Sequence, residues 1–151
     1  MNVRQNDRDR LKLQALDEED LAVLSAHAQD AVMKVGDLAF LPKERRFALA
    51  MNRFVWEKLD GRTQERRRAA LSFDRVTAVK ACQIRRDRPE TVLNLLAVRF
   101  EPTEAPGGII TLIFAGGAAV RLEVECIEAR LADLGAAWAA RAMPVHDIEQ
   151  A

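Results

Sequence analysis

Two carboxylates and one cysteine are the side chains whose types and spacing could support catalysis. Glu123 and Glu125 lie two residues apart in an alternating segment, so both would face the same side of a strand. Adjacent carboxylates shift each other's pKa, which suits acid–base chemistry; the competing interpretation is the solvent face of an edge strand. Cys82 has Lys80 and Arg85 close in sequence, which favours a thiolate. No histidine base accompanies it, so a buried structural thiol is the alternative.

Metal and cofactor chemistry finds little support in the sequence. His27 borders the apolar face of a predicted helix, where a structural role competes with a role as ligand or acid–base group. No cysteine or histidine spacing is typical of zinc ligands. The glycine pairs at 107–108 and 116–117 lack the spacing and the lysine of a phosphate-binding loop. We therefore predict no catalytic residue, no metal ligand and no cofactor.

Arginines are the one feature above background that indicates a binding partner. Residues 41–100 hold 15 Lys and Arg against 7 Asp and Glu, a balance of +8, and the rest of the chain holds 8 against 16, a balance of −8. Guanidinium groups bind phosphates bidentately, so an RNA, DNA or phospholipid surface could dock where such residues gather. The candidate anion-binding residues are Arg45, Arg46, Arg66, Arg67, Arg68, Arg85 and Arg86.

Two other interpretations compete with nucleic-acid binding. The basic residues are spread over several elements, so they could be solvated charge at strand ends, or could complement the acidic remainder of the chain. Base stacking also needs aromatic side chains, and only Phe54 and Trp56 are near. Trp56, beside a polar loop, is a candidate anchor for a partner protein or for a second copy of the chain.

The elements that would position these residues are mostly strands. Residues 109–114 and 120–125 flank a two-glycine turn, which predicts a β-hairpin. Residues 66–84 change phase at Asp74 and Arg75, which predicts a bulge or a bend of the kind by which a long strand wraps around a small barrel. Further strands are expected at residues 11–16, 38–41, 46–56 and 92–100, with residues 31–35 open between strand and helix.

Helices are expected near both ends of the chain. Asp17 is a good N-cap for an early helix that continues to about Gln29. Ile127, Leu131, Leu134 and Trp138 repeat at helical spacing and predict a closing C-terminal amphipathic helix. The expected fold is therefore α+β, with a strongly bent antiparallel sheet of about six to seven strands in a pleckstrin-homology-like partial barrel.

Composition indicates one soluble domain. Hydrophobic residues make up 49% of the 151-residue chain and charged residues 30%, and no apolar stretch reaches the roughly 20 residues that a membrane span needs. Residues 1–10 and 143–151 are expected as tails around a domain at 11–142. Two cysteines make no disulfide framework, which together with the polar N-terminus fits a cytoplasmic protein.

Three segments resemble a known family. They are 16–21 (LDEEDL), 35–47 (VGDLAFLPKERRF) and 114–127 (FAGGAAVRLEVECI). They are similar to an uncharacterised alphaproteobacterial family that is described only as a domain of unknown function. The resemblance covers residues 11–142 and implies a bacterial cytoplasmic protein. It brings no catalytic residues.

Three hypotheses of function follow. The first is a non-catalytic binding or adaptor module that acts through an unknown protein partner or through self-association. The second is a nucleic-acid- or anionic-surface-binding protein that uses Arg66, Arg67 and Arg68. The third is a small enzyme that uses Cys82 or the pair of Glu123 and Glu125. The missing catalytic motifs place the binding module first, and nucleic acid is a possible but not a favoured partner.

Overall fold

A computed structural model describes residues 10–55, 66–134 and 149–150. They form one α-helix, α2 (Glu18–Ala28), two short 3-10 turns, η1 (Val35–Asp37) and η3 (Ala115–Gly117), and a set of strands. The strands are β1 (Lys12–Ala15), β2 (Val32–Lys34), β3 (Leu38–Leu41), β4 (Arg46–Phe54), β5 (Arg66–Phe73), β6 (Val76–Cys82), β7 (Val92–Pro102), β8 (Gly108–Phe114), β9 (Ala119–Val124), β10 (Ala129–Asp133) and β11 (Glu149–Gln150).

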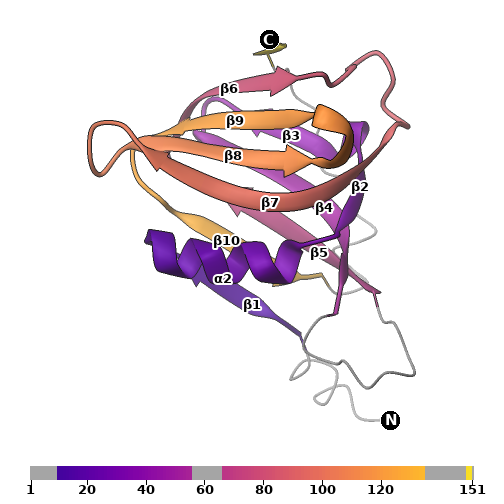
Figure 1. The fold of residues 1–151 in the computed structure, drawn as a ribbon, viewed down its shortest axis with the longest axis horizontal. Helices are drawn as coiled ribbons and strands as arrows, with labels where there is room; N and C mark the ends of the chain where they lie inside the picture. The colour runs from indigo at the N-terminus through magenta and orange to yellow at the C-terminus, as the bar shows by residue number, and fades with distance from the viewer. Residues whose placement is uncertain (1–9, 56–65, 135–148, 151) are drawn as a thin grey trace.

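All of these strands belong to one open sheet of 11 strands. Their order is β1-β10-β5-β4-β2-β7-β8-β9-β6-β11, and β3 pairs with β4. The pairs are antiparallel, except that β11 runs parallel to β6. The sheet curves strongly, so that β4 and β5 face β7, β8 and β9, and α2 packs along the open side against β7 and β1 (Figure 1).

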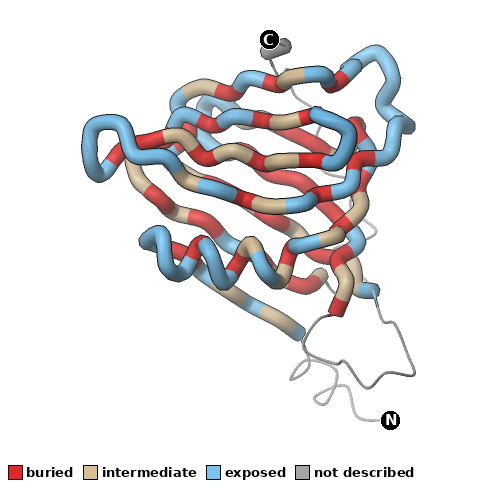
Figure 2. The backbone as a smooth tube through the Cα atoms, viewed as in Figure 1, coloured by how far each residue is buried: buried red, intermediate tan, exposed pale blue. Residues whose placement is uncertain are grey.

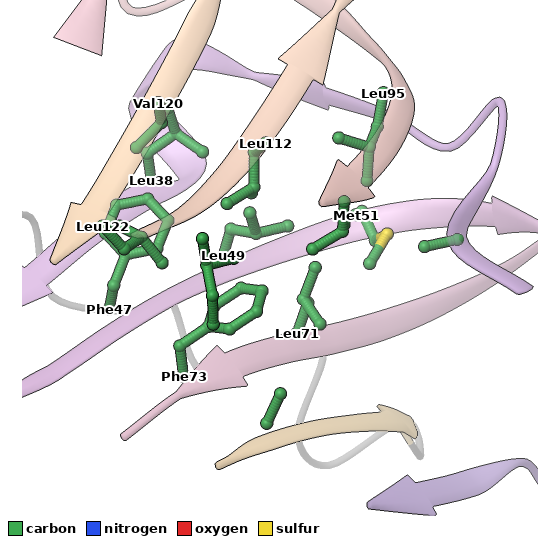
Figure 3. Packing of buried hydrophobic residues seen from close by; sticks show 14 of the residues in the cluster. Leu38, Phe47, Leu49, Met51, Leu71, Phe73, Leu95, Leu112, Val120 and Leu122 are labelled. Atoms are coloured by element: carbon green, nitrogen blue, oxygen red, sulfur yellow. The ribbon is translucent and has the colours of Figure 1, made fainter. Parts of the chain in front are cut away.

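The core lies between the two facing halves of the sheet. Inward side chains alternate with outward ones along most strands, as the alternating burial in Figure 2 shows. Leu49 and Leu71 on one half point toward Leu112 and Leu122 on the other (Figure 3). Each such buried leucine contributes roughly 1.5–3 kcal/mol to folding, so this interior is what holds the sheet in its curved shape.

The early helix that the sequence predicts is present. Asp17 is its N-cap, and its carboxylate accepts a hydrogen bond of 2.8 Å from the backbone N–H of Asp20. Leu21, Leu24 and Ala28 are buried and turn toward the sheet. The helix ends at Ala28, one residue before the predicted end at about Gln29.

The predicted two-glycine turn is confirmed, whereas the bulge or bend predicted within one long strand at Asp74 is a turn between two separate strands. Gly116 and Gly117 adopt φ angles of 84° and 89° between β8 and β9, a conformation that residues with a Cβ rarely adopt. Arg75, with φ of 62°, separates β5 from β6, and the chain crosses there from one half of the sheet to the other. The phase change at Asp74 is thus a corner. Residues 31–35, for which the sequence favoured neither strand nor helix, contain β2, and η1 begins at Val35.

The predicted α+β fold with a closing C-terminal helix is wrong. Residues 129–133 form β10, which pairs with β1 on one side and with β5 on the other. Ala129, Leu131 and Asp133 are buried, whereas Arg130 is exposed, so the segment has the two-residue period of a strand. The described chain is mostly β and has more strands than a six- or seven-stranded partial barrel. Trp138 lies outside the described residues.

Several other predictions lie wholly or partly outside the described residues. These include the polar loop beside Trp56, the candidate anchor Trp56 itself, and most of the two tails. Within the part of the chain that is described, no helix is long and apolar enough to cross a membrane.

Candidate functional site

The seven candidate anion-binding arginines do not gather at one place. In the β4–β5 register, Phe47 pairs with Phe73 and Phe54 pairs with Arg66. Arg46, at the start of β4, and Arg66, at the start of β5, therefore lie at opposite ends of the two strands. At about 3.3 Å per residue their backbones are roughly 25 Å apart. No single small ligand can contact both.

Arg45 and Arg46 form ion pairs at the end of the sheet where β9 leads into β10. The Arg45 guanidinium donates to Glu125 Oε1 at 2.9 Å, and Arg46 Nε donates to Asp74 Oδ1 at 2.7 Å. Glu125 pairs with Arg45, whereas Glu123 lies on the outward face of β9 beside other residues. The two carboxylates are therefore not arranged as an acid–base pair around one substrate atom.

Arg85 and Arg86 lie in the loop between β6 and β7. Arg85 pairs with Asp87 through two hydrogen bonds of 3.2 and 2.7 Å. The hydrogen bond from Arg85 lowers the pKa of the Asp87 carboxyl. In the same loop, Glu90 accepts from Lys34 Nζ at 2.7 Å and raises the pKa of that lysine.

Arg66, Arg67 and Arg68 follow one another along β5, so they alternate between its two faces. Arg66 lies over the Phe54 ring, 5.7 Å from its centroid, and donates to the carbonyl oxygen of Asp30. Arg68 lies 3.7 Å from Asp37. Arg67 turns inward toward Asp133, at 3.8 Å. The triplet therefore presents no single flat basic surface.

Sequence reasoning missed a buried ion pair next to this triplet. Arg53 and Asp133 have side chains that are 0% and 1% exposed, and they form two hydrogen bonds of 2.7 and 2.9 Å. Asp133 Oδ2 also accepts from the backbone N–H of Leu11 at 2.9 Å. The available signal was the spacing of each residue from a buried apolar neighbour, since Arg53 lies two residues after Met51 on β4 and Asp133 lies two residues after Leu131 on β10, on the same face in each case.

A small pocket of about 190 Å³ opens beside this pair. We call it the basic pocket. Its lining residues are Arg10, Arg67, Arg68, Asp133 and Leu134.

A larger, shallow groove of about 450 Å³ lies at the opposite end of α2. It runs between the start of α2, the end of β7, the β7–β8 loop and the β9–β10 connection, which meet at the left of Figure 1. We call it the acidic groove. Its lining residues are Leu16, Asp17, Glu18, Glu19, Phe100, Pro106, Cys126 and Ile127.

The remaining candidate residues lie apart from one another. Cys82 ends β6 and is half-buried, and His27 is half-buried on α2. Glu123 lines a small hollow of about 140 Å³ on the outer face of the sheet, together with Lys80 and Arg121. Among the described residues, no group of three or more His, Cys, Asp or Glu side chains could hold a metal ion.

The fold and these surfaces define a mostly β protein, with one open, curved sheet and one covering helix in its described part. The chain belongs to the DUF2948 family of proteins of unknown function, whose model matches residues 11–146. The predicted membership in a family of unknown function is therefore confirmed. Comparison with curated proteins yields no match. Comparison with solved structures yields none either.

Proposed function

We propose that this protein is a non-catalytic, cytoplasmic binding module that holds a basic, apolar segment of a partner protein in the acidic groove. The observation that carries the proposal is the pairing of an apolar floor with an acidic wall in one groove. Such a surface is complementary to a segment that has a large apolar side chain flanked by lysine or arginine.

The floor of the groove exposes apolar surface to water. Leu16 is 59% exposed although it stands directly before the N-cap of α2, a position whose apolar side chain often packs back on the helix. Phe100 is half-buried beside it, and Pro106 and Ile127 complete the floor. Covering this surface with an apolar side chain of a partner would remove it from water, which favours association.

The wall of the groove carries negative charge. Glu18 and Glu19 are exposed, and neither forms an ion pair with another described residue. Their place in the first turn of α2 stabilises the helix through its dipole, which accounts for part of this charge. The third carboxylate of the lining is Asp17, which caps the helix by accepting from the backbone N–H of Asp20.

Selection from a random dodecapeptide library on phage tests the proposal directly. We expect the enriched peptides to combine one large apolar residue with several Lys or Arg residues. Synthetic copies should bind the full chain in fluorescence anisotropy, and added salt should weaken the binding. The double variant Glu18→Gln/Glu19→Gln and the single variant Leu16→Ser should each weaken the binding about tenfold, since lost charge-assisted and apolar contacts amount to about 1.4 kcal/mol or more.

Matched controls lie at the other end of β7. Val92 is an exposed apolar residue and Glu90 an exposed carboxylate, so Val92→Ser and Glu90→Gln change the same chemistry outside the groove. They should leave peptide binding unchanged. Enriched peptides without basic residues, or equal losses in the groove and control variants, would show that the proposal is wrong.

Anionic-surface binding through Arg66, Arg67 and Arg68 is the alternative proposal. What supports it is the run of three successive guanidinium groups on β5, although their alternation across the strand divides them between its two faces. If the phage selection yields no groove-dependent peptide, binding of labelled RNA at low salt is the next measurement, with loss in Arg66→Ala/Arg67→Ala/Arg68→Ala as the expected signature.

A further inference from the structure

Strand β6 lies near one end of the sheet, at the top of Figure 1 with β11 beside it. On one side it pairs with β9 from Val76 to Cys82. On the other side, its only strand partner among the described residues is β11, which lies opposite Lys80 and Ala81. The backbone N–H of Val76 donates to the carbonyl oxygen of Arg45 at 2.9 Å. Between these two contacts, no described strand pairs with the edge of β6, and such an edge can pair with another chain.

The short strand β11 indicates which kind of segment this edge accepts. It runs parallel to β6, and Glu149 is the register partner of Lys80. Residues opposite each other in neighbouring strands lie on the same face, and successive residues alternate between faces. A longer strand in this register therefore has an acidic residue on the outer face beside Lys80. Its alternate residues lie on the inner face, beside the buried Val79 and Ala81.

Two cations lie together on the outer face next to this edge. Lys80 on β6 is directly opposite Arg121 on β9, and both are exposed. Like charges in this arrangement destabilise a sheet, and neither side chain forms an ion pair with a described residue. Glu123 lines the same hollow without an ion pair to either. An acidic side chain on a strand added beside Lys80 offsets the repulsion between the two cations.

We propose that the edge of β6 binds an extended acidic segment of a partner protein, which adds to the sheet as a parallel strand in place of β11. Main-chain hydrogen bonds to β6 hold the segment, and its acidic residues lie beside Lys80 and Arg121. Because β11 has only two residues, a longer segment that forms more of these hydrogen bonds displaces it. This edge is separate from the acidic groove, which is complementary to the opposite charge.

Fluorescence anisotropy of labelled octapeptides with the full chain tests this edge. The peptide SEVEIEVS has acidic residues on one face of a strand and apolar residues on the other, and SQVQIQVS is its neutral counterpart. We expect the acidic peptide to bind about tenfold more tightly at low salt. Lys80→Glu and Arg121→Glu should each weaken its binding about tenfold. Lys12→Glu changes an exposed lysine on β1, at the other end of the sheet, and should leave it unchanged.

Backbone N-methylation of the acidic peptide distinguishes strand addition from simple charge attraction. The N–H groups of alternate residues in a strand point to the same side, so only one alternate set can donate to β6. We expect methylation of one set to abolish binding and methylation of the other set to change it less than about twofold.

The double variant Glu149→Pro/Gln150→Pro tests whether the peptide replaces β11. Proline has no N–H, so this variant weakens the pairing of β11 with β6. The acidic peptide should then bind about fivefold more tightly, which corresponds to the loss of ~1 kcal/mol of competing interaction. An unchanged affinity would show that the peptide does not bind where β11 lies.

Other results would overturn the proposal as clearly. If the acidic peptide binds no more tightly than the neutral one, β11 only covers the edge of β6. Equal effects of the two methylated sets, or equal losses in Lys80→Glu and Lys12→Glu, would show that no strand is added there. Lys80→Gln repeats the charge test if Lys80→Glu has a lowered melting temperature. Each of these outcomes leaves the acidic groove untested, because that groove is probed with basic peptides.

Discussion

Arg53 and Asp133 are the only charged residues among the described ones that are buried. Removing two charges from water costs several kcal/mol for each ion, and apolar residues of similar size often stabilise a protein more. The pair therefore contributes little net stability. Its effect is to hold the three strands β4, β5 and β10 in one register at the charged end of the interior.

Unfolding in urea tests this account of the pair. Asp133→Leu should lower the free energy of unfolding by about 3–5 kcal/mol, because Arg53 then stays buried without its carboxylate. Adding Arg53→Met should recover most of that loss. Arg46→Gln, which breaks the more exposed pair with Asp74, should cost about 1 kcal/mol or less. If the loss in the double variant equals the sum of the losses in Asp133→Leu and Arg53→Met measured singly, the ion pair is not the cause of those losses.

The pKa of Asp87 provides a second test at the residue scale. Because Arg85 donates hydrogen bonds to this carboxyl, its pKa in the folded protein lies below the ordinary value of 3.8. The associated stabilisation is present above that value and is lost as the pH falls through the lowered pKa. In an NMR titration of the side-chain carboxyl carbons, Arg85→Gln should move the pKa of Asp87 upward. An unchanged pKa would contradict the contact.

At the scale of elements, β10 is where sequence reasoning failed. Ile127, Leu131 and Leu134 satisfy a helical period, and nothing in the local sequence rules that period out. The two-residue period competes with it over 129–133, but one of its inward residues is Asp133, which a hydropathy pattern counts as outward. Its partners, the Arg53 guanidinium on β4 and the backbone N–H of Leu11, are far away in sequence, and they explain why an aspartate faces inward there.

Ala129 distinguishes the strand from the helix. It is fully buried in β10, whereas on a helix with Ile127 and Leu131 on its buried face it would lie on the opposite side. Ala129→Glu should therefore lower the free energy of unfolding by about 3 kcal/mol or more, because it buries an unpaired charge. Arg130→Glu, on the exposed face, should change it by about 0.5 kcal/mol or less. Chemical denaturation measures the free energy of unfolding of both variants. Equal losses in the two would contradict the assignment of residues 129–133 to a strand.

Local signals predicted the other elements well. The Gly116–Gly117 turn, the corner at Arg75 and the cap at Asp17 each depend on residues adjacent in sequence, and each is present. The pairing of β1 with β10 depends on residues more than a hundred positions apart, which no local pattern encodes. That long-range pairing separates the predicted fold from the observed one.

At the scale of the whole molecule, two hollows with different charged linings lie at the two ends of α2. Carboxylates gather at its N-terminal end around the acidic groove, and arginines gather at its C-terminal end around the basic pocket. The sequence showed a charge imbalance but could not place it in space. Leu16, Phe100 and Ile127 meet only because α2, β7 and the β9–β10 connection end at the same edge.

The position of β10 also has a consequence for synthesis of the protein. Leu11 and Asp133, which exchange hydrogen bonds, are 122 residues apart, and β10 is the only strand that pairs with β1 among the described residues. A ribosome that adds roughly 5–20 residues per second needs roughly 6–24 s to synthesise the chain between them. During this interval β1 has no partner strand, and β5, once it is made, keeps one edge uncovered until β10 follows. A nascent chain interrupted before β10 therefore cannot complete its sheet.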